Sequence, residues 1–490
     1  MHHALLVPEV LLEIFAHVSE QSTGITALSQ QSLAALVTTC KTFHEPAMDL
    51  LWSEIEIEIL LGCVTRLHPL IYCSSGSRHW AEGVGPLSAD EARQFLRHSA
   101  RVRSLSIISK RLLPLFSVIH AELYDFPRLR SLTISTKFWD LFLSHTLHHR
   151  HLVTVNEDPQ SIVTRCAALE HLRVVNPDAI DEGDSTADAL SRISDTVRLC
   201  KQLVTLSCPL FDWAAWRHLS NLPTLTRVDA GYYYGDAAPP RPLEQDIANF
   251  SPFSNLTALS FRLRSAAYVI TAVQYSQFPS LKEFTMAVEV LSLPEAEQLF
   301  RALSQCKACE TLEKIKIIVY SSYHKYDDPP KLSAIPHFLC FTQLQILRLT
   351  CYDFCINLDN DILLEDMSSW PHMRDLEIET SCLRHSRITF RGVFTALRLC
   401  PQLRTLQVAM DTTTVDIDPD VEPVRHTSLR ILHLKTPGFH IANAEALARI
   451  IFSCLPCIIL VGGVDWDEVN MHLKSLKDAA LHVTGATLNT

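Results

Sequence analysis

A six-residue pattern of apolar and polar positions, apolar-x-x-apolar-x-apolar, recurs along most of the chain. It begins at Val102, Leu129, Leu169, Leu203, Leu225, Leu256, Leu281, Leu312, Leu344, Met373, Leu403 and Leu429, and a weaker copy begins at Leu455. The last two apolar residues of each copy alternate with a polar one, as along a strand that is buried on one face. Each copy therefore predicts one short strand.

The segments between the copies predict helices. Ser88 and Glu91 have the spacing of a capping box, and so do Ser292 and Glu295. The second box precedes a single apolar helix face, formed by Ala296, Leu299, Phe300 and Leu303. Strands that alternate with helices predict an α/β fold with a parallel sheet. We expect the strands on the concave side of a solenoid and the helices on its convex side.

The spacing of the copies varies from 22 to 40 residues and averages about 29, which fits the leucine-rich-repeat class. The Asn or Cys that this class places eight residues after the first leucine is missing here, so we expect an irregular solenoid. The predicted organisation is a helical module over 1–60, a connecting or capping segment over 61–100, a solenoid of about 12 to 13 repeats over 101–465, and a C-terminal capping helix and tail over 466–490.

The first 60 residues have helical rather than strand periodicity. Two apolar stripes have helical spacing: Leu11, Ile14, Phe15 and Val18, then Leu33, Leu36, Val37 and Cys40. Pro46 opens a third short helix, which ends at Trp52. Three short helices bury little apolar surface by themselves, so we expect this module to lean on another element or on a partner.

The residues of this module resemble an F-box. The resemblance is carried by V-P-E-V-L-L-E-I-F over 7–15, C-K-T-F over 40–43 and the closing Leu51-Trp52, although Val7 replaces the commoner leucine and the loop over 19–32 is long. Followed by degenerate repeats, this segment is similar to the F-box/leucine-rich-repeat families of fungi. The resemblance implies docking to the Skp-type adaptor of a cullin–RING ubiquitin ligase.

The same resemblance implies which residues face or support the adaptor. These candidates are Pro8, Glu9, Leu11, Leu12, Phe15, Leu36, Val37 and Phe43. The alternative is that they contact only the next element of their own chain.

Charged residues stand between the apolar positions of the predicted strands, where they line the concave face of a solenoid. The candidates for binding a target protein are Arg173, Arg227, Arg262, Lys314, Lys316, Arg348, Asp375, Glu377 and Glu379. Basic residues in the middle of the face, followed by acidic ones, could orient a charged partner. The alternative is an ordinary solvated face.

Composition narrows the chemistry. Only 13 of 490 residues are glycine, and no glycine precedes a lysine, so a phosphate-binding P-loop is absent. The net charge of −11 disfavours broad nucleic-acid binding. Fifteen cysteines include two C-x-x-C pairs, Cys306/Cys309 and Cys454/Cys457, which lack nearby histidine pairs. We therefore expect free thiols, no metal site and no cofactor.

The N-terminus has no signal-peptide pattern, and the most apolar stretch, Ile450–Val464, is shorter than a membrane span. We expect a protein of the cytoplasm or nucleus that does not contact membranes. The predicted function is that of a non-catalytic substrate-recognition subunit of an SCF-type ubiquitin ligase. A leucine-rich-repeat scaffold outside ubiquitination is the alternative, and a hydrolase or metalloprotein assembled only by the fold is a third possibility.

Overall fold

The computed structural model describes residues 7, 10–11, 13–15, 17, 27–72, 85–108, 126–135, 167–175, 186–231, 250–320, 331–332, 335–352, 354–356, 358–380, 387–411, 416–417, 425–435, 443–463 and 466–487. The chain forms two compact units, Met1–His218 and Leu219–Thr490.

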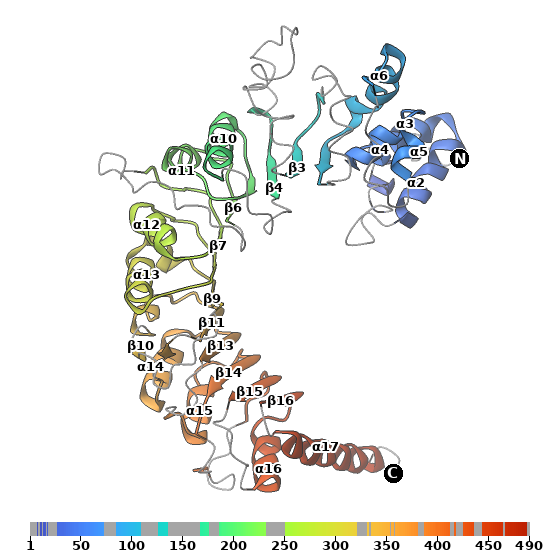
Figure 1. Cartoon of the computed structure of the whole chain (residues 1–490). Helices are drawn as coiled ribbons and strands as arrows, with labels where there is room; N and C mark the ends of the chain where they lie inside the picture. Colours follow the sequence, from blue (N-terminus) through green and yellow to red (C-terminus); the bar gives the residue numbers. More distant parts are fainter. Residues whose placement is uncertain are drawn as a thin grey trace. The chain divides into compact units, whose positions relative to one another are not determined.

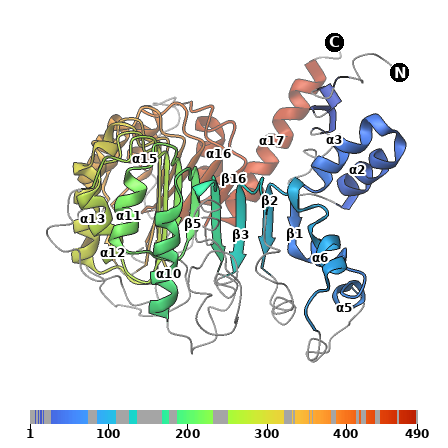
Figure 2. The ribbon, with the colours of Figure 1, turned by 90° about the horizontal axis from the view of Figure 1, so that it is seen from above.

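The first unit combines helices with a parallel sheet. Its helices are α2 (Ala27–Thr39), α3 (Lys41–Leu51), α4 (Ile57–Gly62), α5 (His68–Tyr72), α6 (Ala89–Leu96), the 3-10 turn η2 (Ser99–Arg101), α10 (Thr186–Leu199) and α11 (Trp213–Ser220), which runs to the boundary. Its strands are β1 (Glu54–Glu56), β2 (Ser104–Ile107), β3 (Ser131–Ser135), β4 (His171–Val175) and β5 (Thr205–Cys208). These strands pair in chain order and in parallel, and Figure 2 shows several of them side by side.

The second unit repeats a strand and an outer helical segment. Its sheet strands are β6 (Arg227–Ala230), β7 (Ala258–Leu263), β8 (Glu283–Val288), β9 (Lys314–Val319), β11 (Ile346–Cys351), β13 (Asp375–Thr380), β14 (Thr405–Ala409), β15 (Ile431–Lys435) and β16 (Leu460–Gly462). The short strands β10 (Lys331–Leu332) and β12 (Cys355–Ile356) form a separate pair.

The outer segments of this unit are mainly helical. They are α12 (Ala267–Tyr275), α13 (Leu293–Gln305), η8 (Lys307–Glu310), η9 (Ile335–Phe338), α14 (Asn360–Ser369), α15 (Phe390–Leu397) and α16 (Ala444–Cys454), and α17 (Asp467–Thr487) follows the last strand. Figure 1 shows α12 to α15 on the outer side of the curve of this unit and the strands on its inner side.

Neighbouring repeats are joined in the same way throughout. Two successive backbone N–H groups at the start of a strand donate to one carbonyl of the preceding repeat, as those of Lys282 and Glu283 do to Thr257 O, at 2.9 Å each. The same arrangement recurs from β7 to β16. Although the repeats differ in length, their register is therefore regular where they pair, and the predicted fold of parallel strands with helices on one side is confirmed.

The core lies between the sheet and the helices. The repeat leucines are buried except Leu129, which is half-buried, and the predicted face of α13 (Ala296, Leu299, Phe300, Leu303) is at most 1% exposed. Both predicted capping boxes are present, at α6 and α13. Aromatic side chains pack between repeats: Phe253 stacks on Phe278 with ring centroids 5.2 Å apart, and Phe300 meets Phe338 edge-to-face with centroids 5.0 Å apart.

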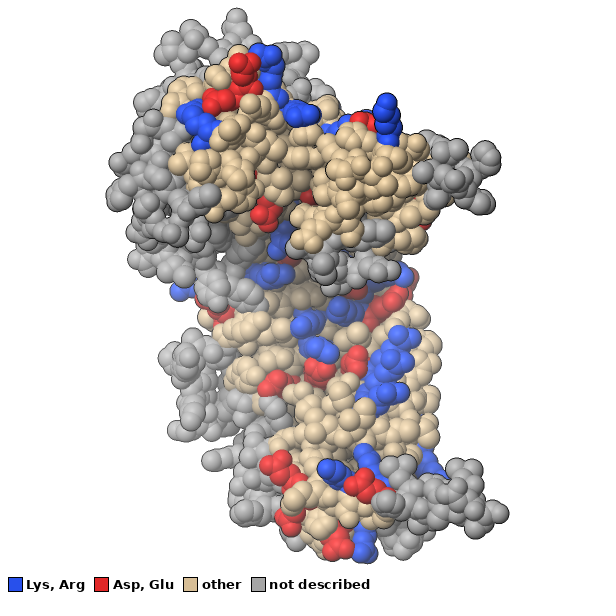
Figure 3. All heavy atoms as spheres, turned by 90° about the vertical axis from the view of Figure 1, so that its right-hand side faces the viewer, with Lys and Arg blue, Asp and Glu red and all other residues tan. Residues whose placement is uncertain are grey.

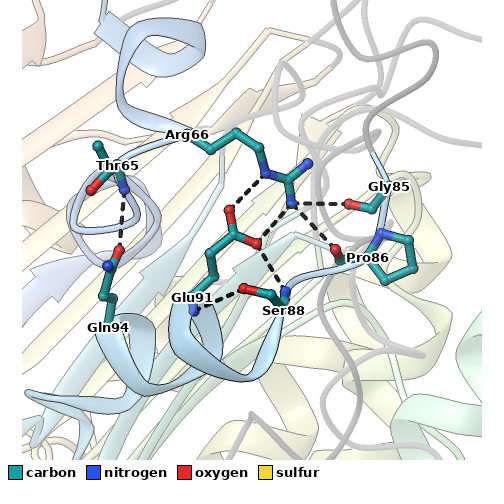
Figure 4. A network of polar contacts seen from close by, with 7 residues as sticks. All are labelled: Thr65, Arg66, Gly85, Pro86, Ser88, Glu91 and Gln94. Carbon is teal, nitrogen blue, oxygen red and sulfur yellow. Dashed lines mark hydrogen bonds and ion pairs between the residues drawn. The ribbon is translucent and has the colours of Figure 1, made fainter.

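The segment that connects the helical module to the repeats is held by Arg66 (Figure 4). Its guanidinium pairs with Glu91 at 2.7 Å and donates to the carbonyls of Gly85 and Pro86. Glu91 also accepts from the Ser88 backbone N–H, and Thr65 N–H donates to Gln94 at 3.3 Å. The hydrogen bonds from Arg66 and Ser88 lower the pKa of Glu91 to about 2. One arginine thus fixes the entrance of α6 against the turn before α5.

Two details of the sheet differ from the sequence prediction. Strand β1 was not predicted, and it places Glu54–Glu56 in the sheet beside β2. The thirteenth repeat begins at Ile458 rather than Leu455, because Leu432 pairs in register with Val461. Leu455 occupies the position three residues before the repeat start. In most of the other repeats this position is also apolar, and its carbonyl accepts the N–H of the first repeat residue. An apolar residue at both positions explains the wrong register.

The cysteines mostly act as small apolar residues. Cysteine stands three residues before a repeat leucine at four positions: Cys200 and Cys400 are completely buried there, Cys309 is half-buried, and Cys166 lies outside the described residues. The expectation that all thiols are free is wrong at Cys355, which is disulfide-bonded. No group of three metal-binding side chains occurs among the described residues. No described helix is long and apolar enough to cross a membrane.

Candidate protein-interaction surfaces

The N-terminal helical module has a small hydrophobic core of its own. Leu11, Phe15, Leu33 and Ala47 are buried in it, and the ring of Phe43 meets that of Phe15 edge-on at 5.5 Å. The partly buried Leu36, Val37, Phe43, Leu50 and Leu51 close around it. The five described candidates for adaptor binding (Leu11, Phe15, Leu36, Val37, Phe43) therefore hold the module together, whereas Pro8, Glu9 and Leu12 lie outside the described residues.

The outer face of the first helical segment carries apolar residues that were not among the predicted adaptor-binding candidates, and they include Ile14, which was predicted in one stripe with Leu11 and Phe15. Val7, Val10 and Ile14 are 43%, 37% and 40% exposed, although Leu11 and Phe15 of the same segment are buried. Val10 and Ile14, four residues apart, lie on one face of the helical segment, and Val7 lies in a bend before it. The sequence did contain the signal, since apolar residues occupy two faces of this segment and the small core accommodates only one.

The module is fixed to the first repeats. Arg101 of η2 pairs with Asp49 and with Glu45 of α3, the latter at 2.5 Å, and Arg128 lies 3.6 Å from Asp49. The ring of Trp52 stacks on that of His98, with centroids 3.9 Å apart and planes 11° apart. The tryptophan that closes the F-box-like pattern thus contacts the segment that leads into the first repeat, and the module is a fixed part of the first unit.

On the sheet of the second unit, strand register brings some of the predicted target-binding residues together. Lys316, Arg348 and Glu377 stand in one row across three neighbouring strands. Lys314 and Asp375 stand in the next row on either side of Ile346, and Glu379 neighbours Thr350. Arg227 and Arg262 lie on β6 and β7, away from this group, and Arg173 lies on β4 in the first unit.

Four of these nine residues are paired with charges on neighbouring strands. Arg348 Nη2 lies 2.9 Å from Glu377 Oε1, Lys314 Nζ lies 3.6 Å from Glu283, and Arg262 Nη2 lies 3.1 Å from Asp229. Figure 3 shows basic and acidic atoms interleaved across the visible face. Burial raises the pKa of Glu377, and Arg348 opposes that rise. The described face therefore presents a neutralised ladder, in which Lys316 and Asp375 make no ion pair with a described residue.

Two tyrosines stand at the far end of this face. Tyr320 directly follows β9 and Tyr352 directly follows β11, and they are 48% and 39% exposed. The Tyr352 hydroxyl donates to Glu379 at 2.9 Å, and burial together with this carboxylate raises the pKa of Tyr352 to about 12. Exposed tyrosines on a rigid sheet suit a protein interface. They occupy the same position in successive repeats, which is the signal that sequence reasoning did not use.

A second set that sequence reasoning missed lies at the start of three neighbouring strands. Arg374, Arg404 and Arg430 are exposed, and the backbone N–H of each later one donates to the carbonyl of the previous one at 2.7 and 2.9 Å. None of them makes an ion pair with another described residue. All three occupy the second position of the six-residue pattern, so the row was visible in the sequence. It is the least neutralised basic group of the described sheet.

No protein-family model matches the chain, and no curated protein matches it. Among solved structures, a protein from Bacteroides fragilis is similar at 13% identity with a TM-score of 0.32, over 63% of this chain and 75% of that one. An internalin from Listeria monocytogenes is similar at 11% identity with a TM-score of 0.30, over 73% of this chain and 91% of that one. At such low TM-scores, the fold assignment rests on the strand pairings described above.

Proposed function

We propose that this chain is a non-catalytic substrate receptor of an SCF-type ubiquitin ligase. In this role the helical module docks to a Skp-type adaptor, and the repeat sheet holds a target protein near the ubiquitin-loaded enzyme, so that its contribution is proximity. The observation that carries the proposal is the exposed apolar stripe of Val7, Val10 and Ile14 on a helical module that is anchored to a repeat solenoid.

The stripe supports docking because exposed apolar residues gathered on one helix face are the usual mark of a helix-binding interface. Leu11 and Phe15 contribute indirectly, since their burial sets the orientation of the helix that carries the stripe. The ion pairs of Arg101 with Glu45 and Asp49 restrain the module relative to the first strands, which is what a receptor needs to place its target reproducibly.

Co-expression with a Skp-type adaptor tests this docking. We expect the adaptor to co-purify in a one-to-one complex with the native chain and to be lost with the double change Val10→Asp and Ile14→Asp. These side chains are exposed, so the variant keeps its fold, which circular dichroism checks. A matched control changes Ile459 and Met471, which are 68% and 66% exposed in the second unit, to Asp. Equal recovery of the adaptor with the stripe variant would contradict the proposal.

The double change Leu11→Asp and Phe15→Asp is less informative. Both side chains are buried in the module core, so charges there unfold the module itself. Loss of the adaptor would then follow from unfolding, whether or not these residues contact it.

For the target, the anchors we propose are Tyr320 and Tyr352, with Lys316 as a basic group on the same face that makes no ion pair with a described residue. Quantitative capture from one cell extract compares the native chain with the double change Tyr320→Ala and Tyr352→Ala. We expect a defined set of proteins to be lost, while Tyr275→Ala on α12, where the tyrosine is 46% exposed, retains them. Identical capture by all three proteins would remove this face from the proposal.

The alternative is an interaction scaffold that works outside ubiquitination. The observation that favours it is that the ion-pair ladder and the tyrosines of the second unit do not depend on the helical module. In that case the tyrosine variant loses partners although no Skp-type adaptor binds the native chain.

A further inference from the structure

The polar sheet face of the first unit carries mainly hydroxyl groups, unlike the charged face of the second unit. Along β1 to β5, the apolar residue in the middle of each strand is at most 5% exposed, and the polar residues on either side of it share the opposite face. Strand register arranges these polar residues in two rows. The first row is Glu54, Ser104, Ser131, His171 and Thr205, and the second row is Glu56, Ser106, Thr133, Arg173 and Ser207.

Both rows have the same order of chemical groups. A carboxylate stands on β1, hydroxyls follow on β2 and β3, an arginine or histidine stands on β4, and a further hydroxyl stands on β5. The order is fixed by the backbone, because each row joins residues that are paired in register between neighbouring parallel strands. The face is therefore acidic at one edge and basic near the other, with neutral polar groups between.

The charges near the two ends of the second row remain apart. Glu56 and Arg173 are both exposed, and neither makes an ion pair with a described residue. Two hydroxyl-bearing strands lie between them, so three strand spacings separate their backbones by about 14 Å. In the second unit, by contrast, Arg348 and Glu377 stand on adjacent strands and pair at 2.9 Å. The first unit thus presents a positive and a negative group that a partner can contact separately.

The hydroxyls between these charges are available as well. The Thr205 hydroxyl lies 2.8 Å from His171 Nδ1, whereas the hydroxyls of β2 and β3 make no hydrogen bond with a described residue. Their residues are half-buried, and each hydroxyl can both donate and accept. An extended polypeptide has backbone N–H and C=O groups that need such partners, whereas a helix pairs most of its own. The hydroxyls therefore favour an extended chain as the occupant.

We propose that this face binds an extended peptide segment in which an acidic and a basic residue stand four positions apart. The acidic residue pairs with Arg173, the basic residue pairs with Glu54 and Glu56, and the hydroxyls of β2 and β3 bond to the backbone between them. An extended chain rises about 3.4 Å per residue, so four residues span about 14 Å, which matches the separation of the charges on the sheet. A segment with two like charges meets repulsion at one end.

This binding involves the first unit alone and requires neither the adaptor nor the tyrosines of the second unit. Fluorescence anisotropy of the full chain with labelled synthetic peptides tests it. The mixed peptide has Asp and Lys four positions apart with Ser and Thr between them, and the comparison peptide has Lys at both positions. We expect the native chain to bind the mixed peptide about tenfold more tightly than the comparison peptide.

The variant Arg173→Glu should reverse this preference, because both ends of the second row are then acidic. We expect it to bind the mixed peptide about tenfold more weakly than the native chain does, and to prefer the peptide with two lysines. The matched control is Lys201→Glu, an exposed residue of the same unit outside both rows, which should keep the native preference. Circular dichroism checks that each variant is folded.

Ser106→Tyr places a bulky side chain in the middle of the second row without changing its charge, so we expect it to weaken binding of the mixed peptide. The proposal is overturned if the native chain does not bind the mixed peptide, or binds it no better than the peptide with two lysines. It is also overturned if Arg173→Glu leaves the preference unchanged, or if only neutral oligosaccharides bind this face. Recovery of a Skp-type adaptor is measured separately, so each proposal can fail without the other.

Discussion

The helical module and the repeat sheet differ in the surfaces they expose: the first exposes apolar side chains and the second exposes paired charges. The module buries one apolar face of its first helical segment and leaves Val7, Val10 and Ile14 exposed. The sheet buries its apolar residues against the helices, and its charged face is largely neutralised by neighbouring strands, as in the pair of Arg348 with Glu377. The module therefore leaves an apolar surface exposed, whereas the sheet presents a charged face whose ion pairs join neighbouring strands.

The depth of burial in the repeats can be tested at Trp370, which has the largest expected effect. Its side chain is fully buried, and its indole N–H donates to Phe338 O at 3.0 Å. Trp370→Ala leaves a cavity and an unpaired carbonyl, so we expect it to cost about 4–6 kcal/mol. Urea denaturation, followed by a spectroscopic signal from the second unit, measures this loss in the free energy of unfolding. A cost below about 1 kcal/mol would show that this part of the core is not close-packed.

A buried carboxyl within the same layer gives the repeats a pH dependence. Asp366 of α14 is 2% exposed, and burial, with a contribution from Glu365, raises its pKa from 3.8 to about 7. The folded protein therefore holds this proton more tightly than the unfolded chain does. Its contribution to stability is fully present below about pH 4, declines as the pH rises toward 7, and is lost above that pH.

Asp366→Asn removes this titration. We expect the stability of the variant relative to the native chain to rise by about 2.5 kcal/mol between pH 5 and pH 8, because only the native chain must hold a buried carboxylate at the higher pH. Urea denaturation of both proteins at the two pH values measures the difference. A difference that does not change with pH would mean that Asp366 is already ionised in the folded protein at pH 5.

The attachment of the module to the sheet is expected to respond less strongly. Arg101→Ala removes the ion pairs with Glu45 and Asp49, all of which are partly exposed. We expect amide hydrogen exchange in α3 to accelerate roughly two- to fivefold, in line with the small free energies of such pairs. Arg93→Ala, which removes the exposed pair of Arg93 with Asp90 on α6, is the control that should leave α3 unchanged.

The fold was largely predictable because its signal is local. Each six-residue copy contains the buried residues of its own strand, so periodicity alone located the strands. The prediction failed where that signal weakens: β1 has a single buried residue, Ile55, and at the last repeat Leu455 imitates the repeat start that Ile458 provides. Both errors arose because apolarity marks burial but does not specify which repeat position is buried.

The candidate surfaces were less predictable because they depend on contacts between distant residues. Arg348 and Glu377 are read from the sequence as a basic and an acidic feature, yet strand pairing places them 2.9 Å apart and cancels much of their charge. Likewise, Leu11 and Ile14 are equally apolar in sequence, and only the size of the module core decides that the first is buried and the second exposed. Which side chains pair and which are buried is therefore decided by tertiary contacts, which the sequence pattern does not show.

The smallest effect is expected from removing one ion pair of the sheet, that of Arg348 with Glu377. This change tests the electrostatics of the face with little effect on the stability of the fold. Arg348→Gln removes the positive partner of Glu377 but keeps a polar side chain of similar length. Because the pair is partly exposed, we expect a loss of at most about 1 kcal/mol. The pKa of Glu377, already raised by burial and held back by Arg348, should rise further, which carbon-detected NMR titration can follow. An unchanged Glu377 pKa would show that Lys316 and His433 sustain the neutralisation without Arg348, and that the ladder acts as a network of charges and not as separate pairs.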